Sequence, residues 1–311
     1  MEKTENQTAP VGRFAPTPSG RMHLGNVFAG LIAWLSVRSR GGSMVLRMED
    51  LDTQRTSEEY AQVLRQDLLW LGLDWDLETE PQSRRSAVYD RYFARLEEMD
   101  LLYPCYCTRS QLHSVNAPHL SDGTYVYPGT CRNLTQSQKA GFGRLPAWRV
   151  KVPDKVWTVE DKVQGHYQEN LQTDCGDFVV RRADGVYVYQ LAVTVDDGLA
   201  GVTEVVRGMD LLSSAPRQMY LQELFGFQYP VYGHVPMLLA PDGRRLSKRD
   251  KDLDLGILRQ RTTPQRIIGI LAAASGLIDR PEPICARELA EEFSWNKLRK
   301  QDIYLDASIL Q

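Results

Sequence analysis

The chain has 311 residues, of which 42% are hydrophobic and 25% are charged. This composition is typical of folded globular proteins and excludes collagen-like, coiled-coil and disordered chains. With 37 basic and 40 acidic residues, the formal net charge is -3. The net charge gives the protein no overall positive potential that would favour binding of nucleic acid. A nucleic-acid partner would therefore need a local basic face.

The length predicts about two domains of roughly 150 residues each, or one large domain with an insertion. Segment 1–12 is polar and lacks the charged and then apolar order of a signal peptide. The longest uncharged apolar stretches, 27–37 and 267–278, are shorter than the roughly 18 residues that cross a bilayer. The five cysteines, an odd number, fit a reducing compartment. We therefore expect a cytoplasmic protein with no membrane partner.

The first part of the chain alternates between strand and helix patterns. The predicted elements are a strand over 11–17, a helix over 23–40, a strand over 44–48 that ends in the acidic cluster 49–52, and a helix over 56–73. Strands that alternate with helices predict a parallel sheet with helices on its faces.

The middle of the chain changes character. From about 103 to 187, connections rich in Gly, Pro and Ser join short alternating runs such as 147–152 and 178–181, which indicates an insertion. The sheet is then expected to resume with a strand over 186–194, a helix over 211–225 and a strand over 229–238. Beyond Lys251 we expect only helices, over 253–261, 264–275 and 285–300.

These patterns predict an α/β fold with a Rossmann-like parallel-sheet core that binds a nucleotide and is interrupted by an insertion domain. The predicted division is 1–102 for the first half of the core, 103–186 for the insertion, 187–250 for the second half of the core, and 251–311 for a short C-terminal helical region.

The turn between the first strand and the first helix carries the first candidate site, the segment 13–26. Backbone N–H groups at a helix start and the positive end of its dipole bind anions, and small residues let a phosphate approach. His23 and Asn26 add side-chain donors, and Gly25 lies between them. The glycine spacing is that of neither a Walker loop nor a dinucleotide fingerprint. Taken alone, the segment is equally typical of a glycine-containing turn in which a histidine caps the helix.

A basic loop over 244–249 follows Asp242 and Gly243 and forms the second candidate site. Clustered cations can neutralise the charge that develops on a transferring phosphoryl or nucleotidyl group. Taken alone, such a loop is typical of a solvated surface.

Together the two segments resemble the two signature sequences of the class I aminoacyl-tRNA synthetases. The flanking segments 13–20, 47–52, 189–197 and 201–208 resemble the glutamate branch of that family, and the resemblance covers roughly residues 11–250. The chain departs from the general pattern at Asn26, where the pattern has a second histidine, and at Arg245, Leu246 and Arg249 in the second signature. Asn26 keeps hydrogen-bonding capacity and the arginines keep positive charge, so we expect catalysis to survive.

The resemblance implies a set of site residues. Catalysis would depend on His23, Asn26 and Lys248, and ATP with Mg²⁺ would bind at His23, Gly25, Asn26, Ser247 and Lys248. Glutamate presents two carboxylates and one ammonium. A selective pocket therefore needs cationic side chains for the carboxylates and a carboxylate for the ammonium. By the same resemblance, glutamate would be bound by Arg13, Ala15, Thr17, Glu49, Tyr189 and Arg207, with the arginines on carboxylate and Glu49 on the ammonium. Taken singly, the charged residues among them are also explained by structural salt bridges.

Three cysteines of the insertion, Cys105, Cys107 and Cys131, suggest a structural zinc site, which generally has four ligands. Chemistry alone suggests His113 or His119 as the fourth ligand. The resemblance instead suggests Tyr127, because a zinc knuckle of this form recurs in the glutamate branch. We expect one zinc ion per chain; the alternative is that the cysteines bind no metal. Cys175 and Cys285 are expected to be packing residues.

A full glutamyl-tRNA synthetase continues beyond the second signature into a large helical domain that reads the anticodon. Segment 250–311 is short and its charges are balanced, so we expect no such domain. This shortened form resembles the glutamyl-Q tRNA(Asp) synthetases, which activate glutamate with ATP and attach it to queuosine in the anticodon of tRNA(Asp). The implied partners are ATP, L-glutamate and the queuosine-bearing anticodon loop. The alternatives are a compact conventional glutamyl-tRNA synthetase that charges the tRNA 3′ end, and a non-catalytic relative that binds a nucleotide or tRNA.

Overall fold

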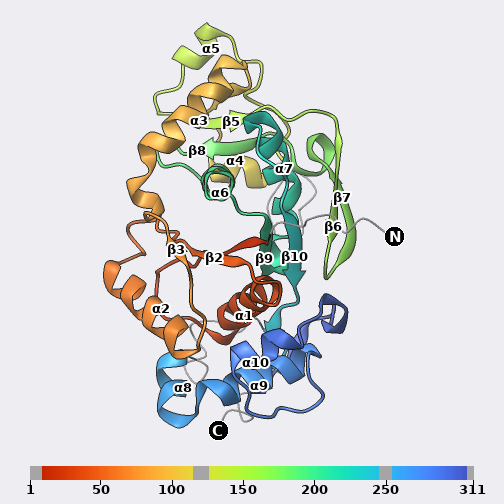
Figure 1. Cartoon of the computed structure of the whole chain (residues 1–311). Helices are drawn as coiled ribbons and strands as arrows, with labels where there is room; N and C mark the ends of the chain where they lie inside the picture. Colours follow the sequence, from red (N-terminus) through yellow and green to blue (C-terminus); the bar gives the residue numbers. More distant parts are fainter. Residues whose placement is uncertain (1–8, 115–125, 245–253, 307–311) are drawn as a thin grey trace.

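The structure is a computed structural model that describes residues 9–114, 126–244 and 254–306. Residues 1–8, 115–125, 245–253 and 307–311 lie outside the described residues, and with them most of the second signature. Figure 1 shows the central sheet in the middle of the molecule, the insertion at one end and the C-terminal helices at the other.

The central sheet has five strands, all parallel, in the order β10-β9-β1-β2-β3. Their bounds are Val11–Phe14 for β1, Ser43–Leu46 for β2, Leu77–Glu78 for β3, Glu204–Gly208 for β9 and Val231–Val235 for β10. The predicted α/β fold with a parallel sheet is therefore confirmed. Strand β9 pairs with β1 although almost two hundred residues separate them, so the sheet resumes after the insertion, but it does so with a strand over 204–208 that the sequence did not predict.

Two hydrophobic cores lie on the two faces of this sheet. One contains α1 (Leu24–Arg38), α2 (Glu58–Trp70) and the C-terminal helices, and the other contains α3 (Ser86–Glu98), α6 (Tyr189–Leu199) and α7 (Ser214–Phe225). Successive side chains of a strand point to opposite faces, and in β9 Val205 belongs to the second core and Val206 to the first. The sheet is therefore covered on both sides, as parallel sheets require.

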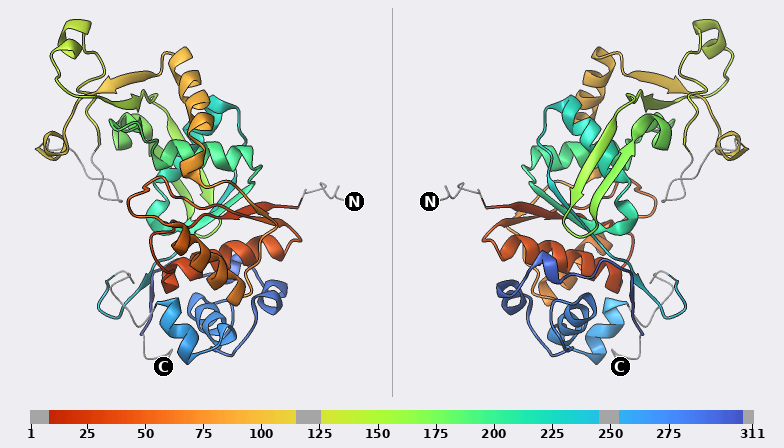
Figure 2. Two further views of the ribbon diagram at one scale, coloured as in Figure 1. Left: turned by 90° about the vertical axis from the view of Figure 1, so that its left-hand side faces the viewer. Right: turned by 90° about the vertical axis from the view of Figure 1, so that its right-hand side faces the viewer.

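The insertion is built from small antiparallel sheets. Strands β4 (Leu102–Cys105), β5 (Ala147–Val150) and β8 (Phe178–Arg181) form one sheet, and β6 (Val156–Asp161) and β7 (Gly165–Asn170) form a hairpin. Short helices α4 (Arg109–Ser114) and α5 (Gln136–Ala140) and a π-helical turn over Leu171–Cys175 connect them. The side views show the first sheet and its loops projecting from the body, while the hairpin lies against the body (Figure 2).

The C-terminal region contains α8 (Leu255–Arg261), α9 (Pro264–Ser275) and α10 (Ala286–Glu291), and single 3-10 turns occur at Gln82–Arg84, Met209–Leu211 and Trp295–Lys297. Helix α9 has the predicted bounds because its sequence marks both ends. The Thr263 hydroxyl accepts from the N–H of Arg266, Pro264 occupies the first turn, and Gly276 ends the helix with φ of 88°.

Three predictions of local structure are wrong. The predicted helix over 285–300 is shorter, because α10 ends at Glu291 and only a 3-10 turn follows at Trp295–Lys297. The predicted strand over 186–194 is largely helical, because α6 begins at Tyr189; its run from Leu191 to Val195 is buried, so tertiary packing overrides its β-branched residues. The C-terminal region is not wholly helical, because β12 (Ile303–Tyr304) pairs in parallel with β11 (Leu238–Leu239). The N–H groups of Ile303 and Leu305 bond the carbonyls of Met237 and Leu239, which this edge would otherwise leave unpaired.

Among the described residues, no helix combines the length and the apolar character needed to cross a bilayer.

Helix α9 offers a test of its packing at Gly269. A Cβ atom on Gly269 would lie 1.9 Å from the backbone oxygen of Glu282, so the chain segment before α10 crosses this helix in contact with its backbone. Gly→Ala inside a helix ordinarily raises the free energy of unfolding by about 0.5–1 kcal/mol. Here we expect Gly269→Ala to lower it by about 1–3 kcal/mol, because the overpacked backbone cannot move freely. Denaturant titration measures the change.

Gly143→Ala is the matched control, since nothing lies within 4 Å of a Cβ at that position. Its effect should stay within about 0.5 kcal/mol. A Gly269→Ala variant more stable than the wild type would contradict the close crossing.

Candidate active site

A cleft of about 510 Å³ opens at the carboxyl ends of the parallel strands. Its lining comes from the ends of β1, β9 and β10, from the loop after β2, and from the first turns of α1 and α6. Ligands of open parallel sheets bind in this position, where loops from several strands meet. The cleft is thus the candidate site on topology alone.

Most of the sequence-predicted site residues come together here. Those that line the cleft are Arg13, Ala15, Thr17, His23, Gly25, Asn26, Glu49, Tyr189 and Arg207. Ser247 and Lys248 lie outside the described residues. The cleft therefore combines residues from both halves of the predicted core, which the insertion separates in sequence.

His23 caps the N-terminus of α1. Its backbone is extended, and its Nδ1 accepts from the N–H of Gly25 at 3.1 Å. A Cβ at Gly25 would lie 3.0 Å from Cε1 of the imidazole, so the glycine makes room for this cap. His23 is thus a capping residue, as one interpretation of the sequence predicted, and it also lines the cleft. Because Nδ1 accepts, the proton of a neutral imidazole is on Nε2.

Arg47 organises the carboxylates beneath the cleft, a role that the sequence did not reveal. Its guanidinium is fully buried, with Nη1 at 2.6 Å from Asp197 Oδ1, Nη2 at 3.1 Å from Glu49 Oε1 and Nε at 3.8 Å from Asp196 Oδ2. Burial raises the pKa of the Glu49 carboxyl, and the charges of Arg47 and Arg13 offset only part of that effect. Glu49 is therefore a carboxylate held in place but costly to ionise.

Asp197 links Arg47 to Arg13. Its Oδ2 lies 3.5 Å from Nε of Arg13, whose Nη1 donates to the carbonyl of Val206 at 3.0 Å. Burial opposes ionisation of Asp197, but the charges of Arg47 and Arg13 outweigh it and lower the pKa of this carboxyl. An ionised Asp197 thus fixes both arginines.

Arg207 is held by neutral groups on the other side of the cleft. Nη1 donates to the Tyr189 hydroxyl at 3.2 Å and to Gln218 Oε1 at 2.8 Å, and Nε donates to Nε2 of His234 at 2.9 Å. Nη2 is buried and has no hydrogen-bond partner among the described residues. An unpaired buried donor of this kind costs free energy unless a ligand accepts from it.

Gln218 and His234 were missed at the sequence level. His234 offered a weak signal, because it is a polar residue within an otherwise apolar predicted strand, whereas nothing in the sequence marks Gln218.

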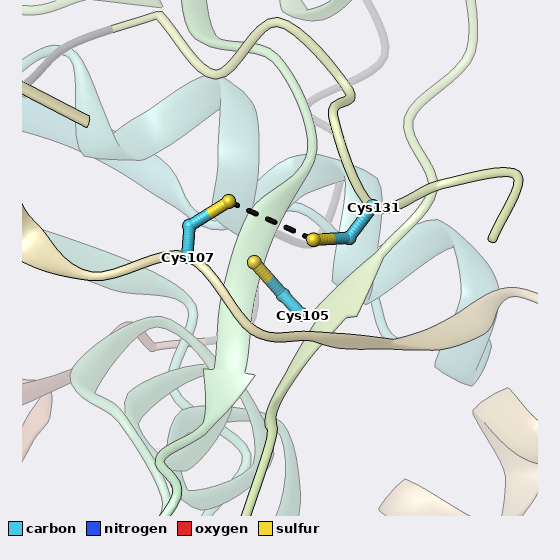
Figure 3. A group of neighbouring side chains, drawn as sticks. All are labelled: Cys105, Cys107 and Cys131. Carbon is cyan, nitrogen blue, oxygen red and sulfur yellow. Dashed lines mark hydrogen bonds between the residues drawn. The ribbon is translucent and has the colours of Figure 1, made fainter. Parts of the chain in front are cut away.

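The insertion brings the predicted metal ligands together (Figure 3). Cys105 ends β4, and its sulfur and those of Cys107 and Cys131 all lie within 4.8 Å of one another. The hydroxyl of Tyr127 lies 3.5 Å from the Cys105 sulfur and 3.8 Å from that of Cys107. Three sulfurs and a phenol oxygen match the number of ligands that a structural zinc ion takes.

The other candidate residues for this cluster can also be placed. His119 lies outside the described residues, as does the side chain of His113. Cys175 is buried, and Cys285 caps α10 by accepting from the N–H of Glu288. Both residues therefore have structural roles without the cluster.

The surroundings of the cluster favour the anion of one sulfur and oppose that of another. Nε of Arg149 donates to the Cys105 sulfur at 3.2 Å, and its guanidinium lies 3.6 Å from the centre of the Tyr127 ring. Burial opposes ionisation of Cys105, but the charge of Arg149 and the hydrogen bonds to the sulfur together outweigh it and lower the pKa of that thiol. Burial and the neighbouring Cys105 charge raise the pKa of the Cys107 thiol to about 12. Arg149 thus gives the cluster one thiol that ionises more readily than a free cysteine.

Comparisons with known proteins agree with this geometry. Residues 11–308 match the family model of the tRNA synthetases class I (E and Q), catalytic domain. A glutamyl-Q tRNA(Asp) synthetase from Symbiobacterium thermophilum is 44% identical over 96% of this chain and 97% of its own length. One from Nitratidesulfovibrio vulgaris is 45% identical over 96% of each chain.

A solved structure extends the likeness to three dimensions. The crystal structure of a glutamate tRNA ligase from Elizabethkingia meningosepticum in complex with its amino acid matches with a TM-score of 0.82 at 26% identity, covering 97% of this chain and 68% of that one. The resemblance found in the sequence is thus confirmed. The chain belongs to the class I tRNA synthetases (E and Q) and, within them, to the glutamyl-Q tRNA(Asp) synthetase family.

Proposed function

We propose that this protein activates L-glutamate with ATP as glutamyl-adenylate and transfers the glutamyl group to the queuosine base in the anticodon of tRNA(Asp). The observation that carries the proposal is the match to glutamyl-Q tRNA(Asp) synthetases over 96% or more of both chains. The proposed substrates, ATP and tRNA, imply a cytoplasmic protein.

The charges of the cleft support glutamate as the amino acid. Arg13 and Arg207 would bind its two carboxylates, and Glu49 would bind its ammonium. The unpaired Nη2 of Arg207 supports this role, because a carboxylate oxygen would satisfy it. Ala15, Thr17 and Tyr189 would complete the pocket wall. The similar glutamate tRNA ligase, solved with its amino acid, also supports this assignment.

In the first step, an oxygen of the glutamate α-carboxylate attacks the α-phosphorus of ATP. The new P–O bond forms in line with the bond to the bridging oxygen, which breaks and releases pyrophosphate. His23, Asn26 and Lys248 would stabilise the added negative charge, with Nε2–H of His23 as donor and the start of α1 contributing its positive dipole. Gly25 and Ser247 would let the phosphates approach. Magnesium bound with ATP would neutralise phosphate charge.

In the second step, a hydroxyl of the queuosine cyclopentene ring attacks the carbonyl carbon of the mixed anhydride. An ester bond forms to the glutamyl group as the hydroxyl proton is lost to solvent, and AMP leaves with the electrons of the broken bond between the carbonyl carbon and the phosphate oxygen. Anticodon bases can be splayed out of their stack, so this base can reach a cleft that a paired base cannot.

We further propose that Cys105, Cys107, Tyr127 and Cys131 hold one structural zinc ion within an insertion spanning 103–186. The converging sulfurs and the nearby phenol oxygen support this ligand set. When bound, the ion would cross-link the end of β4 to the loop that carries Tyr127 and Cys131.

The acceptor assignment is tested with an anticodon stem-loop of tRNA(Asp) that has no acceptor end. With ATP present, the queuosine-bearing stem-loop should accept labelled glutamate, and the same stem-loop with guanosine in place of queuosine should not. Retention of label on the RNA measures the transfer. Glutamate attached to full-length tRNA but never to the stem-loop would indicate charging of the 3′ end, and absence of glutamate-dependent pyrophosphate exchange would indicate a non-catalytic relative.

Glu49→Gln tests the ammonium site. We expect glutamate to bind roughly ten- to a hundredfold more weakly, because a contact between charged groups is lost. For the wild type, affinity should fall on acidification through the raised pKa of Glu49, since the protonated carboxyl no longer attracts the ammonium. The Glu49→Gln variant should lack this contribution. Calorimetric titration across pH measures both effects.

Glu78→Gln is the control, because Glu78 pairs with Arg65 away from the cleft. Equal glutamate affinity in the wild type and Glu49→Gln would remove Glu49 from the amino-acid site.

Cys131→Ser tests the zinc site. The wild type should contain one zinc ion per chain by elemental analysis, and Cys131→Ser should lose most of it, because serine is a poor zinc ligand. Cys175→Ala is the matched control, since Cys175 is another buried cysteine of the insertion and should leave the zinc content unchanged. Equal zinc in wild type and Cys131→Ser would show that the cluster is not the binding site.

A further inference from the structure

A buried chain of three side chains connects the insertion to the cleft. It runs from Asp161, at the end of β6, through His234 in β10 to Arg207 in β9. We propose that Asp161 and His234 are positioning residues that hold the Arg207 guanidinium in the orientation in which it binds a carboxylate of the amino-acid substrate. This inference rests on the proposed function, because it takes Arg207 as a glutamate-binding residue.

His234 lies between the two charged groups. Its Nδ1 is 2.6 Å from Oδ2 of Asp161, and its Nε2 accepts from Nε of Arg207 at 2.9 Å. The side chains of Asp161 and His234 are both 0% exposed. Water therefore does not compete for these bonds, and the geometry is set by protein groups alone.

The chemistry of the neighbours determines which ring nitrogen carries the proton. A guanidinium only donates, so Nε2 must accept from Arg207. The other nitrogen, Nδ1, then carries the proton and donates to the carboxylate of Asp161. Burial lowers the pKa of His234 to about 4, although Asp161 acts in the opposite direction, so the ring is neutral near pH 7. Asp161 thus selects the tautomer that Arg207 needs.

Asp161 is itself fixed by backbone groups. Its Oδ1 accepts from the N–H groups of Val163 and Gln164 at 2.9 Å, within the turn that joins β6 to β7. Both of its oxygens also accept from the backbone N–H of His234, at 3.0 and 3.1 Å. The hairpin turn and strand β10 therefore hold the carboxylate from two sides. Burial opposes its ionisation, but the hydrogen bonds from His234 and from the backbone together outweigh this and lower its pKa.

These contacts fix the plane of the Arg207 guanidinium and leave its charge without a carboxylate partner in direct contact. Nε is held by His234, and Nη1 is held by Tyr189 and Gln218 on the opposite edge. No carboxylate among the described residues forms an ion pair with Arg207: Asp161 is separated from it by the imidazole, and Asp197 interacts with it only at longer range. Only Nη2 is left unpaired, and Arg207 lines the cleft. A donor positioned before binding has no reorganisation to undergo when the carboxylate arrives.

The test begins with Asp161→Asn, which preserves the size of the side chain. The amide nitrogen of asparagine would donate to Nδ1, so Nε2 would carry the proton and face the Nε–H of Arg207. Two donors then oppose each other, and the guanidinium must turn away. We expect the dissociation constant for glutamate to rise at least about tenfold, with that for ATP changed by less than about twofold. Calorimetric titrations with glutamate and with ATP measure the two dissociation constants.

Two variants of His234 test the acceptor. Gln at position 234 keeps an oxygen within reach of Arg207, whereas Leu has similar size and no acceptor. We expect His234→Leu to weaken glutamate binding at least about tenfold and His234→Gln to restore a large part of it. Equal glutamate affinity in the two variants would overturn the proposal, because a structural role depends on volume and not on the acceptor.

Glu204→Gln is the matched control. Glu204 is also a buried carboxylate on β9, but it lies at the start of the strand, away from the cleft, where it accepts from Ser36 and Arg40. We expect it to lower stability without changing glutamate affinity. If Glu204→Gln weakens glutamate binding as much as Asp161→Asn does, the effect is general destabilisation and the proposal fails.

The remaining outcomes are also decisive. A folded Asp161→Asn variant that binds glutamate like the wild type overturns the inference alone, provided that the wild type supports glutamate-dependent pyrophosphate exchange. A wild type that neither binds glutamate nor supports that exchange overturns the proposed function and the inference with it. If Asp161→Asn does not fold, the two His234 variants decide. If none of the three folds, the network is a requirement of folding and the positioning role is rejected.

Discussion

Arg47 carries a positive charge into the interior just after strand β2, where water cannot stabilise it, and the cleft is built around the groups that compensate it. A buried ion costs several kcal/mol unless it is paired and fully hydrogen-bonded. Glu49 and Asp197 provide the close partners. Since Asp197 also contacts Arg13, one buried guanidinium sets the relative positions of the proposed ammonium-binding carboxylate and a proposed carboxylate-binding arginine. Compensation of the Arg47 charge thus determines where the groups of the proposed binding site lie.

The two arginines of the cleft differ in how their charge is balanced. Arg13 lies 3.5 Å from a carboxylate, which neutralises part of its field. Arg207 contacts Tyr189, Gln218 and His234, all neutral, and its charge remains available. Coulomb interactions strengthen as water is excluded, so a bound carboxylate would gain more from Arg207 than from a solvated arginine. This asymmetry depends on a histidine that stays neutral, which its burial ensures.

The sequence predicts the parallel sheet, because the hydrophobic periods of strands and helices can be recognised in short segments. It also predicts where the cleft lies, because the carboxyl ends of parallel strands meet at one edge of the sheet. The family resemblance supplies the residues that line it. The errors have a common cause. Residues 191–195 are buried within a helix, so tertiary packing decides their conformation. Strand β12 pairs with backbone groups of Met237 and Leu239, which are distant from it in sequence. Asp161 and His234 are 73 positions apart, and no local pattern relates them.

The β6–β7 hairpin shows that the insertion also contributes to the body of the protein. Its turn carries Asp161, and Gln164 in the same turn donates to the carbonyl of His234 at 2.9 Å. A displacement of the turn would therefore withdraw Asp161, which selects the tautomer of His234 that accepts from Arg207. The turn is thus joined to strand β10 by hydrogen bonds of fixed geometry between largely buried groups, and not by apolar packing alone.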